Sequence, residues 1–481
     1  MNFKSYESKI KNLDNIVVIT SYENEKFETP FKQINLLIEG FEGKYNKIEI
    51  IKAFIDEKLH TVCLVGLGEN LKLTSEKARV VGGNLAKKLK ELVNEDNCKS
   101  KDIDLLNIGL SEENYIAFFE GMKLGNYEFT KYKTDNKSKC IENVNIYTDR
   151  DDAKLLEKAN IFADSTIIAR DLVNEPANVL YPETLANKVV ELGKEFGFEV
   201  EVYEEEKIEA LKMEAFLAVA KGSINKPRFI VMRYMGNSSD KEILGLVGKG
   251  LTFDTGGYSI KPTDSMVNMK TDMGGAASVI GAMCAIAKDK LDKNVIAVVA
   301  ACENAISGNS YKPGDIIGSM AGKTIEILNT DAEGRLTLAD AIYYIVNNEK
   351  VTKVVDVATL TGAAIIALGS VATAVVTNNN KFYNQLEDAA DISGEKIWRM
   401  PTFDEYKEQL KGKEADLKNT GGREAGCITA GLFVGEFVGD TPWLHLDIAG
   451  TSETSKSCGY KSSGATGEGV RTLYYLARNK K

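Results

Sequence analysis

Four short apolar runs in the second half of the chain place the strongest limit on its fold. They lie at residues 243–247, 294–301, 353–358 and 443–448, and each is bounded by glycine or polar turns. Runs of this length predict buried strands of a largely parallel sheet. Helical segments alternate with them, including the apolar segment 274–288, whose small residues allow close packing. The alternation predicts an α/β fold with a mixed central sheet flanked by helices.

The length of 481 residues favours two domains over a single core. Residues 1–150 combine strand-like runs at 16–20 and 61–66 with an amphipathic segment at 75–92, which predicts a smaller N-terminal α/β domain. Residues 151–172 contain no Pro or Gly and predict a linking helix. Residues 173–481 then form the larger C-terminal domain, which we predict to be catalytic. The N-terminal domain is expected to serve assembly or regulation.

Composition excludes several classes of protein. The net charge of -10 argues against a dedicated nucleic-acid binder, which normally presents a basic surface. No apolar run approaches the roughly 18 residues of a membrane-spanning helix, and the N-terminus lacks the apolar segment of a signal peptide. The seven cysteines are dispersed and form no CxxC pair, which is typical of reduced thiols. These features predict a cytoplasmic protein without a membrane partner.

Charged residues gather in two glycine-rich segments, residues 247–277 and 329–336. The chemically capable residues there are Lys249, Asp254, Lys261, Asp272, Asp331, Glu333 and Arg335. In open α/β sheets, sites form beyond the carboxyl ends of the strands, where these segments are expected to lie. Four converging carboxylates repel one another unless cations lie between them. Two divalent ions about 3.5–4 Å apart would relieve that repulsion and form a two-metal hydrolase centre.

Simpler interpretations exist for each residue alone. An aspartate in a glycine-rich turn is usually a turn former, and Asp331 with Glu333 is also typical of a helix N-terminus. Capping, however, requires neither four acids nor a lysine inside a Gly-Lys-Gly turn. The two histidines, His60 and His445, are too few for a histidine zinc site. The sequence therefore favours oxygen ligands, which suit Mn²⁺, Mg²⁺ or Zn²⁺.

The two segments closely resemble the leucine aminopeptidase family of two-metal cytosolic exopeptidases. Asn329-Thr-Asp-Ala-Glu-Gly-Arg-Leu336 is the most specific of the shared motifs. Further similar segments are residues 170–182, 358–363, 419–423, 445–451 and 464–471. The resemblance covers about residues 160–481, whereas the first 150 residues match only in length and α/β character.

The resemblance implies a role for each charged residue. Asp254 and Glu333 would bridge both metal ions, Lys249 and Asp272 would complete one site, and Asp331 would complete the other. The ions would be Mn²⁺ or Zn²⁺, with Mg²⁺ or Co²⁺ as alternatives. They would lower the pKa of a bridging water molecule and make it the nucleophile. Lys249 would have to be neutral to act as a ligand.

The resemblance also implies how a peptide is bound and cleaved. Lys261 would stabilise the oxyanion, and Arg335 would hold a bicarbonate ion that serves as general base. Asp272 and one metal ion would bind the free α-amino group of the substrate. Six further positions match the first side-chain pocket, which would suit Leu or another apolar residue. They are Met269, Asn329, Thr359, Leu360, Gly362 and Ala449.

Two rival functions and some departures from the family pattern remain. A narrow dipeptidase, for example one preferring Cys-Gly, would use the same centre, and a DNA-binding regulator is the alternative from another class. An inactive homologue is disfavoured because all seven charged residues are present. Tyr258, Asp264 and Glu424 differ from the residues usual in the family, and Tyr258 is expected to narrow the approach to the site. The resemblance further implies a homohexamer, built as a dimer of trimers, that acts on peptides.

Overall fold

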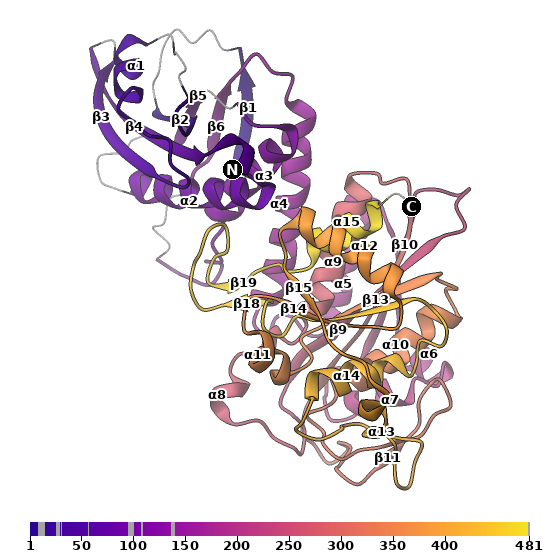
Figure 1. Ribbon diagram of the computed structural model, residues 1–481. Helices are drawn as coiled ribbons and strands as arrows, with labels where there is room; N and C mark the ends of the chain where they lie inside the picture. Colours follow the sequence, from indigo (N-terminus) through magenta and orange to yellow (C-terminus); the bar gives the residue numbers. More distant parts are fainter. Residues whose placement is uncertain are drawn as a thin grey trace. The chain divides into compact units, whose positions relative to one another are not determined.

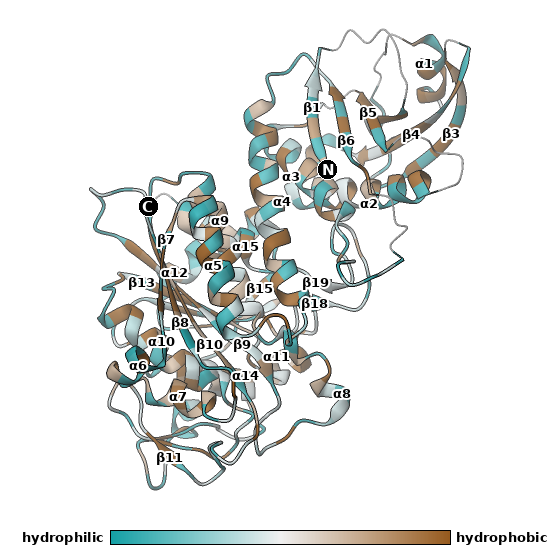
Figure 2. Ribbon diagram, turned by 180° about the vertical axis from the view of Figure 1, so that it is seen from behind, coloured by the Kyte–Doolittle hydropathy of each residue, from teal (hydrophilic) through white to brown (hydrophobic). Residues whose placement is uncertain are grey.

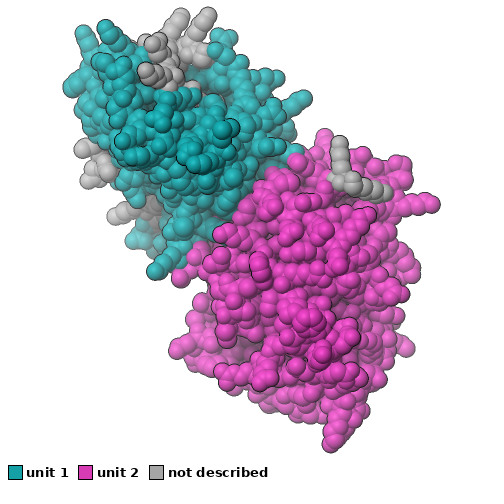
Figure 3. Space-filling view, viewed as in Figure 1, with its two compact units in different colours: residues 1–164, 456–463 teal, residues 165–455, 464–481 magenta. Residues whose placement is uncertain are grey.

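The computed structural model describes residues 1–7, 15–25, 29, 31–55, 57–94, 101–106, 109–135 and 140–479. The chain divides into two compact units (Figure 3). Unit 1 comprises Met1–Asp164 and Lys456–Ser463, and unit 2 comprises Ser165–Ser455 and Gly464–Lys481. The expected fold class is confirmed, with a smaller N-terminal α/β part and a larger C-terminal part built on a mixed sheet. The functional boundaries at residues 150 and 172 stay predictions.

Unit 1 contains a six-stranded sheet in the order β1-β6-β5-β2-β4-β3 (Figure 1). All neighbours are parallel except β3 and β4, which pair antiparallel. The strands are β1 (Asn2–Tyr6), β2 (Ile16–Tyr22), β3 (Ile48–Ile55), β4 (Lys58–Gly68), β5 (Asp102–Leu106) and β6 (Asn143–Tyr147). The helices are α1 (Lys32–Ile38), η1 (Asn70–Lys72), α2 (Ser75–Asn94), α3 (Glu112–Asn126) and α4 (Ala153–Asn174), of which α4 runs on into unit 2. The strands expected near residues 16 and 61 and the helix near residue 75 are confirmed.

Strand β2 shows why this sheet is covered on both faces. All of its residues are buried, and successive side chains alternate between two apolar clusters, as the two-residue period of a strand requires. Ile16 and Val18 belong to the cluster that includes α2 and α3. Val17 and Ile19 belong to the cluster that includes α1. The sheet is therefore the middle layer of unit 1.

A short segment from late in the sequence completes unit 1. Tyr460 of segment Lys456–Ser463 is only 2% exposed. The guanidinium carbon of Arg79 lies 5.7 Å from the centre of the Tyr460 ring. A Cβ added to Gly83 of α2 would lie 2.5 Å from Tyr460 Cα, so only glycine permits this approach. Lys87 Nζ also donates a 2.9 Å hydrogen bond to the Lys461 carbonyl.

Unit 2 is built on an eight-stranded mixed sheet in the order β15-β14-β17-β13-β9-β10-β8-β7. Its strands are β7 (Glu199–Tyr203), β8 (Arg228–Met235), β9 (Ile243–Asp254), β10 (Asn294–Asn304), β13 (Lys353–Ala358), β14 (Thr373–Thr377), β15 (Ile397–Arg399) and β17 (Trp443–Asp447). Four central strands, β10, β9, β13 and β17, are parallel and confirm the four predicted runs. Two small sheets accompany it, one of β11 (Ile316–Ile317), β12 (Ile325–Glu326) and β16 (Leu417–Lys418), the other of β18 (Glu453–Thr454) and β19 (Gly464–Ala465).

Helices and short helical turns accompany this sheet in unit 2. They are α5 (Pro182–Phe196), α6 (Glu205–Ala210), α7 (Glu214–Ala220), α8 (Thr263–Met266), η2 (Met269–Thr271), α9 (Gly274–Lys288), α10 (Gly334–Asn347), α11 (Gly362–Leu368), α12 (Asn380–Ser393), α13 (Asp404–Glu408), α14 (Gly426–Gly435) and α15 (Val470–Arg478). In Figure 2, α5 alternates between hydrophobic and hydrophilic colour, and its buried residues include Leu185, Val189 and Leu192. Among the described residues, every helix is too short or too polar to cross a bilayer.

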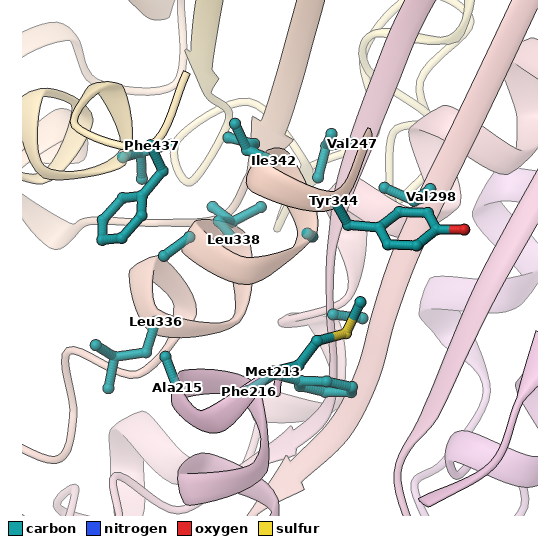
Figure 4. Close-up of a cluster of buried hydrophobic side chains, with 14 of the residues drawn as sticks. Met213, Ala215, Phe216, Val247, Val298, Leu336, Leu338, Ile342, Tyr344 and Phe437 are labelled. Carbon is teal, nitrogen blue, oxygen red and sulfur yellow. The ribbon is translucent and has the colours of Figure 1, made fainter. Parts of the chain in front are cut away.

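The main core of unit 2 lies between the sheet and helices α7, α10 and α14. Figure 4 shows Leu338, Ile342 and Tyr344 of α10 beside Phe216 of α7 and Val298 of β10. All these side chains are almost fully buried. This packing holds α10, and thus the motif at its N-terminus, against the carboxyl half of the sheet.

Six of the seven cysteines lie within the described residues and are free. Cys98 lies outside them.

Candidate metal centre

Strand β9 stands at the point where the order of the central strands reverses. The chain runs from β9 through α9 to β10 on one side, and later through α10 to β13 on the other. Val247 belongs to the core that includes α10, whereas Gly248 faces Ala276 of α9. The helices therefore cover opposite faces of β9. Ligand sites of open α/β sheets form at such switch points, beyond the carboxyl ends of the strands.

Three buried carboxylates meet at this end of β9. Asp254 ends the strand, Asp272 lies just before α9, and Glu333 is the N-cap residue of α10. Each can offer a carboxylate oxygen within 4.8 Å of one from each of the others, and the three residues are at most 5% exposed. Asp331, the fourth predicted acid, is joined to this cluster through Lys261.

Two lysines lie among the carboxylates. Lys249 Nζ is 2.7 Å from Asp272 Oδ1 and 3.0 Å from Glu333 Oε1. Lys261 Nζ is 2.8 Å from Asp254 Oδ2 and 2.5 Å from Asp331 Oδ1. Burial lowers the pKa of both amines, but the surrounding carboxylates outweigh burial and raise each pKa above its ordinary value. The lysines thus balance part of the negative charge.

Burial acts in the opposite direction on the acids. It raises the pKa of Glu333 to about 8, with the Asp254 charge adding to the effect. It also raises the pKa of Asp272 to about 6, against the attraction of Lys249. A buried carboxylate loses the hydration that stabilises its charge, and neighbouring acids repel it. Additional positive charge at this point would favour the ionised forms of both groups.

The free oxygens show that the cluster fits divalent cations. Asp272 Oδ2 and Glu333 Oε2 are buried and have no hydrogen-bond partner among the residues that the structure describes. Buried polar atoms are normally paired, so unpaired ones require an explanation. Carboxylate oxygens with unused lone pairs are ligands for hard or borderline cations. The donor set therefore fits metal ions of this kind.

Arg335, in the first turn of α10, adds a buried cation that lacks a carboxylate ion pair within the part of the chain that the structure describes. Its Nη1 donates a 2.8 Å hydrogen bond to the Asn419 carbonyl, while its buried Nε has no partner. Burial lowers the pKa of Arg335 to about 10, and Glu333 and Asp447 partly offset that effect. A guanidinium with unused donors is well suited to an oxyanion.

One cavity of about 590 Å³ brings all of the predicted site residues together. Its walls include the seven charged residues of the two motifs and the six predicted pocket residues. These thirteen residues are Lys249, Asp254, Lys261, Met269, Asp272, Asn329, Asp331, Glu333, Arg335, Thr359, Leu360, Gly362 and Ala449. The convergence that the sequence predicted is thus present in the structure.

Tyr258 does not line this cavity. It is 45% exposed, and its hydroxyl donates a hydrogen bond to the Ser307 carbonyl over 3.3 Å. Asp264 and Glu424 are also absent from the walls. Arg423, from the similar segment 419–423, and Glu453 also line the cavity, although neither was predicted as a site residue.

Buried polar residues that were not predicted from the sequence support the acids and the cavity walls. Asn304 is fully buried and donates from Nδ2 to Asp254 Oδ1 over 2.8 Å. It ends β10 and pairs with Asp254 across the two strands. A polar residue three positions after the predicted apolar run 294–301 was the available signal. Asp447 similarly accepts hydrogen bonds from Thr361 and the Leu360 amide, in a loop that lines the cavity.

A cluster of buried acids that fits divalent cations, at the switch point of a mixed α/β sheet, is typical of a metal-dependent hydrolase. Comparison with known proteins places it more narrowly. The catalytic domain of the cytosol aminopeptidase family matches residues 167–474, and the N-terminal domain of the same family matches residues 35–136. The chain belongs to the cytosol aminopeptidase family, whose members are metal-dependent peptidases.

Individual relatives match over nearly the whole chain. The probable cytosol aminopeptidase of Clostridium perfringens is 51% identical, covering 100% of this chain and 99% of the relative. That of Clostridium tetani is also 51% identical, covering 97% and 98%. Among solved structures, the bottromycin maturation enzyme BotP in complex with Mn superposes with a TM-score of 0.85 at 29% identity, covering 96% of this chain and 99% of BotP.

Proposed function

We propose that this chain is an aminopeptidase that hydrolyses the N-terminal peptide bond of peptides and prefers Leu or another apolar residue at that end. The observation that carries the proposal is the single cavity in which acids, lysines, Arg335 and the predicted side-chain pocket meet. Family membership supports the reaction class, and the cavity supports the assignment to particular residues.

Five residues would hold two divalent ions. Asp254 and Glu333 would contact both, Lys249 and Asp272 one of them, and Asp331 the other. Lys249 has to lose its proton before its nitrogen can bind a cation. When bound, the two ions would lower the pKa of a water molecule to near neutrality and so supply the nucleophile. Mn²⁺ and Zn²⁺ are the first choices, with Mg²⁺ and Co²⁺ as alternatives, and the Mn complex of the relative BotP supports Mn²⁺.

Two cationic side chains would act on the reacting peptide bond. Lys261, which the carboxylates keep protonated, would donate a hydrogen bond to the scissile carbonyl oxygen and stabilise the charge that develops there. Arg335 would hold a bicarbonate ion through its unused donors, and this anion would accept the proton as general base. Both side chains line the same cavity.

The cavity walls would select the substrate. Asp272 lies close enough to the predicted pocket to bind the free α-amino group, since its Oδ1 accepts a 2.8 Å hydrogen bond from Thr359. Met269 and Leu360 would contact an apolar first side chain, together with Asn329, Gly362 and Ala449. A hydrogen bond between a charged amino group and this carboxylate would favour peptides with a free N-terminus.

We further propose a cytoplasmic homohexamer, built as a dimer of trimers. Family membership supports both proposals. Size-exclusion chromatography with light scattering would measure the assembly directly, and a monomer at micromolar concentration would contradict it.

The decisive experiment is hydrolysis of leucyl-p-nitroanilide by metal-stripped protein as Mn²⁺ or Zn²⁺ is titrated back. Activity should appear only with metal and approach saturation near two ions per chain. It should collapse in Asp331→Ala and persist in Asp264→Ala, a matched change of an exposed aspartate outside the cavity walls. Silence with every metal, while dipeptides such as Cys-Gly are cleaved, would replace this proposal with the narrow dipeptidase.

A further inference from the structure

Asn419 is a fully buried asparagine that the proposed mechanism does not use. It is 0% exposed and directly follows β16, which pairs with β12 just upstream of the acidic loop. Its own main-chain amide donates a 2.9 Å hydrogen bond to the Glu326 carbonyl. Residue 419 thus lies along the segment that leads to Asp331 and Glu333.

The Asn419 side chain binds the backbone of that segment from several sides. Its Oδ1 accepts hydrogen bonds from the amides of Leu328, at 2.9 Å, and Asn329, at 3.4 Å. Its Nδ2 donates to the carbonyls of Asn329, at 2.6 Å, and Ala332, at 3.4 Å. One amide group therefore fixes the loop on both sides of Asp331 and immediately before Glu333.

The main-chain carbonyl of Asn419 holds the next functional residue. It accepts the 2.8 Å hydrogen bond from Arg335 Nη1, and this contact orients the guanidinium. Asn419 therefore holds by hydrogen bonds both the loop that carries two proposed metal ligands and the proposed anion-binding arginine. Thr420, Gly422 and Arg423, which follow it, line the cavity.

We propose that Asn419 is the positioning residue that sets the metal-binding loop, and that it governs affinity for the ion held by Asp331. This inference rests on the proposed roles of Asp331 and Glu333. A buried asparagine could instead serve the fold alone, by satisfying backbone groups that would otherwise be unpaired. The two roles differ in what happens to metal affinity when the amide is removed.

Asn294 provides a matched control for that difference. It is 3% exposed, and it fixes a backbone loop in the same way, accepting from the Asn237 amide and donating to the carbonyls of Asn237 and Asp240. Asn294 is the first residue of β10. Asn304, which contacts Asp254 of the metal centre, is the last residue of the same strand, so Asn294 lies at the opposite end. Asn294→Ala should therefore cost a similar amount of stability without a change at the metal centre.

The test is calorimetric titration of the metal-stripped full-length protein with Mn²⁺ alone. Wild type and Asn294→Ala should bind two ions with the same affinities. Asn419→Ala should lose at least about 10-fold in one of these affinities, the scale expected when support of a metal ligand is removed. Raising the Mn²⁺ concentration should restore much of its kcat. Equal Mn²⁺ binding by wild type and Asn419→Ala, or an equal loss in Asn294→Ala, would overturn the proposal.

Asn419→Asp keeps the test decisive if the alanine variant does not fold. It preserves the shape and the Oδ1 acceptor, but it places a carboxylate oxygen against the Asn329 and Ala332 carbonyls that now accept from Nδ2. This repulsion would move the loop, so the weaker Mn²⁺ site is again expected. Wild-type Mn²⁺ affinities in this variant would overturn the proposal. A failure of the aminopeptidase proposal would look different. In that case the wild-type protein would bind two ions but would hydrolyse no peptide.

Discussion

Gly334 leaves the space that the Lys249 side chain occupies. A Cβ added to Gly334 would lie 2.4 Å from Lys249 Cε, and Lys249 Nζ reaches Asp272 and Glu333 through this gap. The residue opens α10 in an ordinary helical position, where alanine is otherwise the better helix former. Glycine is therefore required at this position because of the lysine and not because of the helix. A change to alanine tests the metal centre without weakening the helix.

Gly334→Ala should displace Lys249 and weaken metal binding by about 10-fold or more, while the protein stays folded. Metal content after dialysis against dilute Mn²⁺, together with kcat, measures the effect. Gly308→Ala is the control, because an added Cβ there meets nothing within 4 Å. Wild-type metal content in Gly334→Ala would show that Lys249 is not a ligand.

At the scale of single residues, the charged residues of the site could be predicted from the sequence. The buried residues that form hydrogen bonds with them could not. Asp254 and Glu333 stand in glycine-rich motifs that resemble a family, so their positions could be predicted. Asn304 stands outside these motifs. Asn419 lies in the similar segment 419–423, but asparagine is typical of turns and nothing in its neighbourhood predicts burial, so no role was assigned to it. Their importance follows only from contacts with residues far away in the sequence, such as Asp254 and Ala332.

Helix α7 is capped from another element. Asp340 of α10 accepts hydrogen bonds from the amides of Phe216, at 2.9 Å, and Met320, at 2.8 Å. Phe216 lies in the first turn of α7, whose N-cap residue Met213 makes no side-chain cap. The first-turn amides of a helix need partners, and here a buried carboxylate from α10 supplies one.

Burial raises the pKa of Asp340 from 3.8 to about 7. As the pH rises from about 4 to about 7, the unfolded chain loses this proton while the folded protein retains it. The folded state then binds more protons, so the free energy of unfolding falls, by at most about 1.4 kcal/mol per pH unit. Asp340→Asn lacks this titration.

Urea unfolding at pH 5 and pH 7.5 measures the effect. The stability of wild type relative to Asp340→Asn should decrease at the higher pH. Asp404→Asn, which changes a side chain that is 89% exposed, should show no such trend. A difference between wild type and Asp340→Asn that is independent of pH would contradict a raised pKa.

The extents of the elements show what an apolar pattern can predict. Strand β9 was expected at residues 243–247 but continues to Asp254. Gly248, Lys249 and Gly250 interrupt the apolar run, yet pairing with β10 continues past them. The antiparallel strands β7, β8 and β14 were not predicted, because their pairing depends on partners elsewhere in the chain.

At the scale of the whole molecule, Tyr460 is the residue that ties segment Lys456–Ser463 into unit 1. It packs against Gly83 and beneath Arg79, and it is almost fully buried. Nothing in the sequence predicted that a segment so close to the C-terminus would join the N-terminal unit. The boundary expected at residue 150 assumes that each domain is one continuous stretch of the chain.

Tyr460→Ala should destabilise unit 1 by about 3 kcal/mol, the scale for truncation of a buried aromatic side chain. Calorimetry should show a lower unfolding temperature for one transition. Tyr132→Ala, at a position that is 52% exposed, should change stability by less than about 0.5 kcal/mol. Equal transition temperatures in wild type and Tyr460→Ala would contradict a structural role for the segment.

The interrupted path of unit 1 has a consequence for biosynthesis. Residues 165–455 separate its two pieces, so a ribosome working at roughly 5–20 residues per second needs about 15–60 s to pass from one to the other. During that interval the nascent chain presents the surface of α2 around Gly83 without Tyr460 against it. Unit 1 is thus completed only after residues 456–463 have been translated.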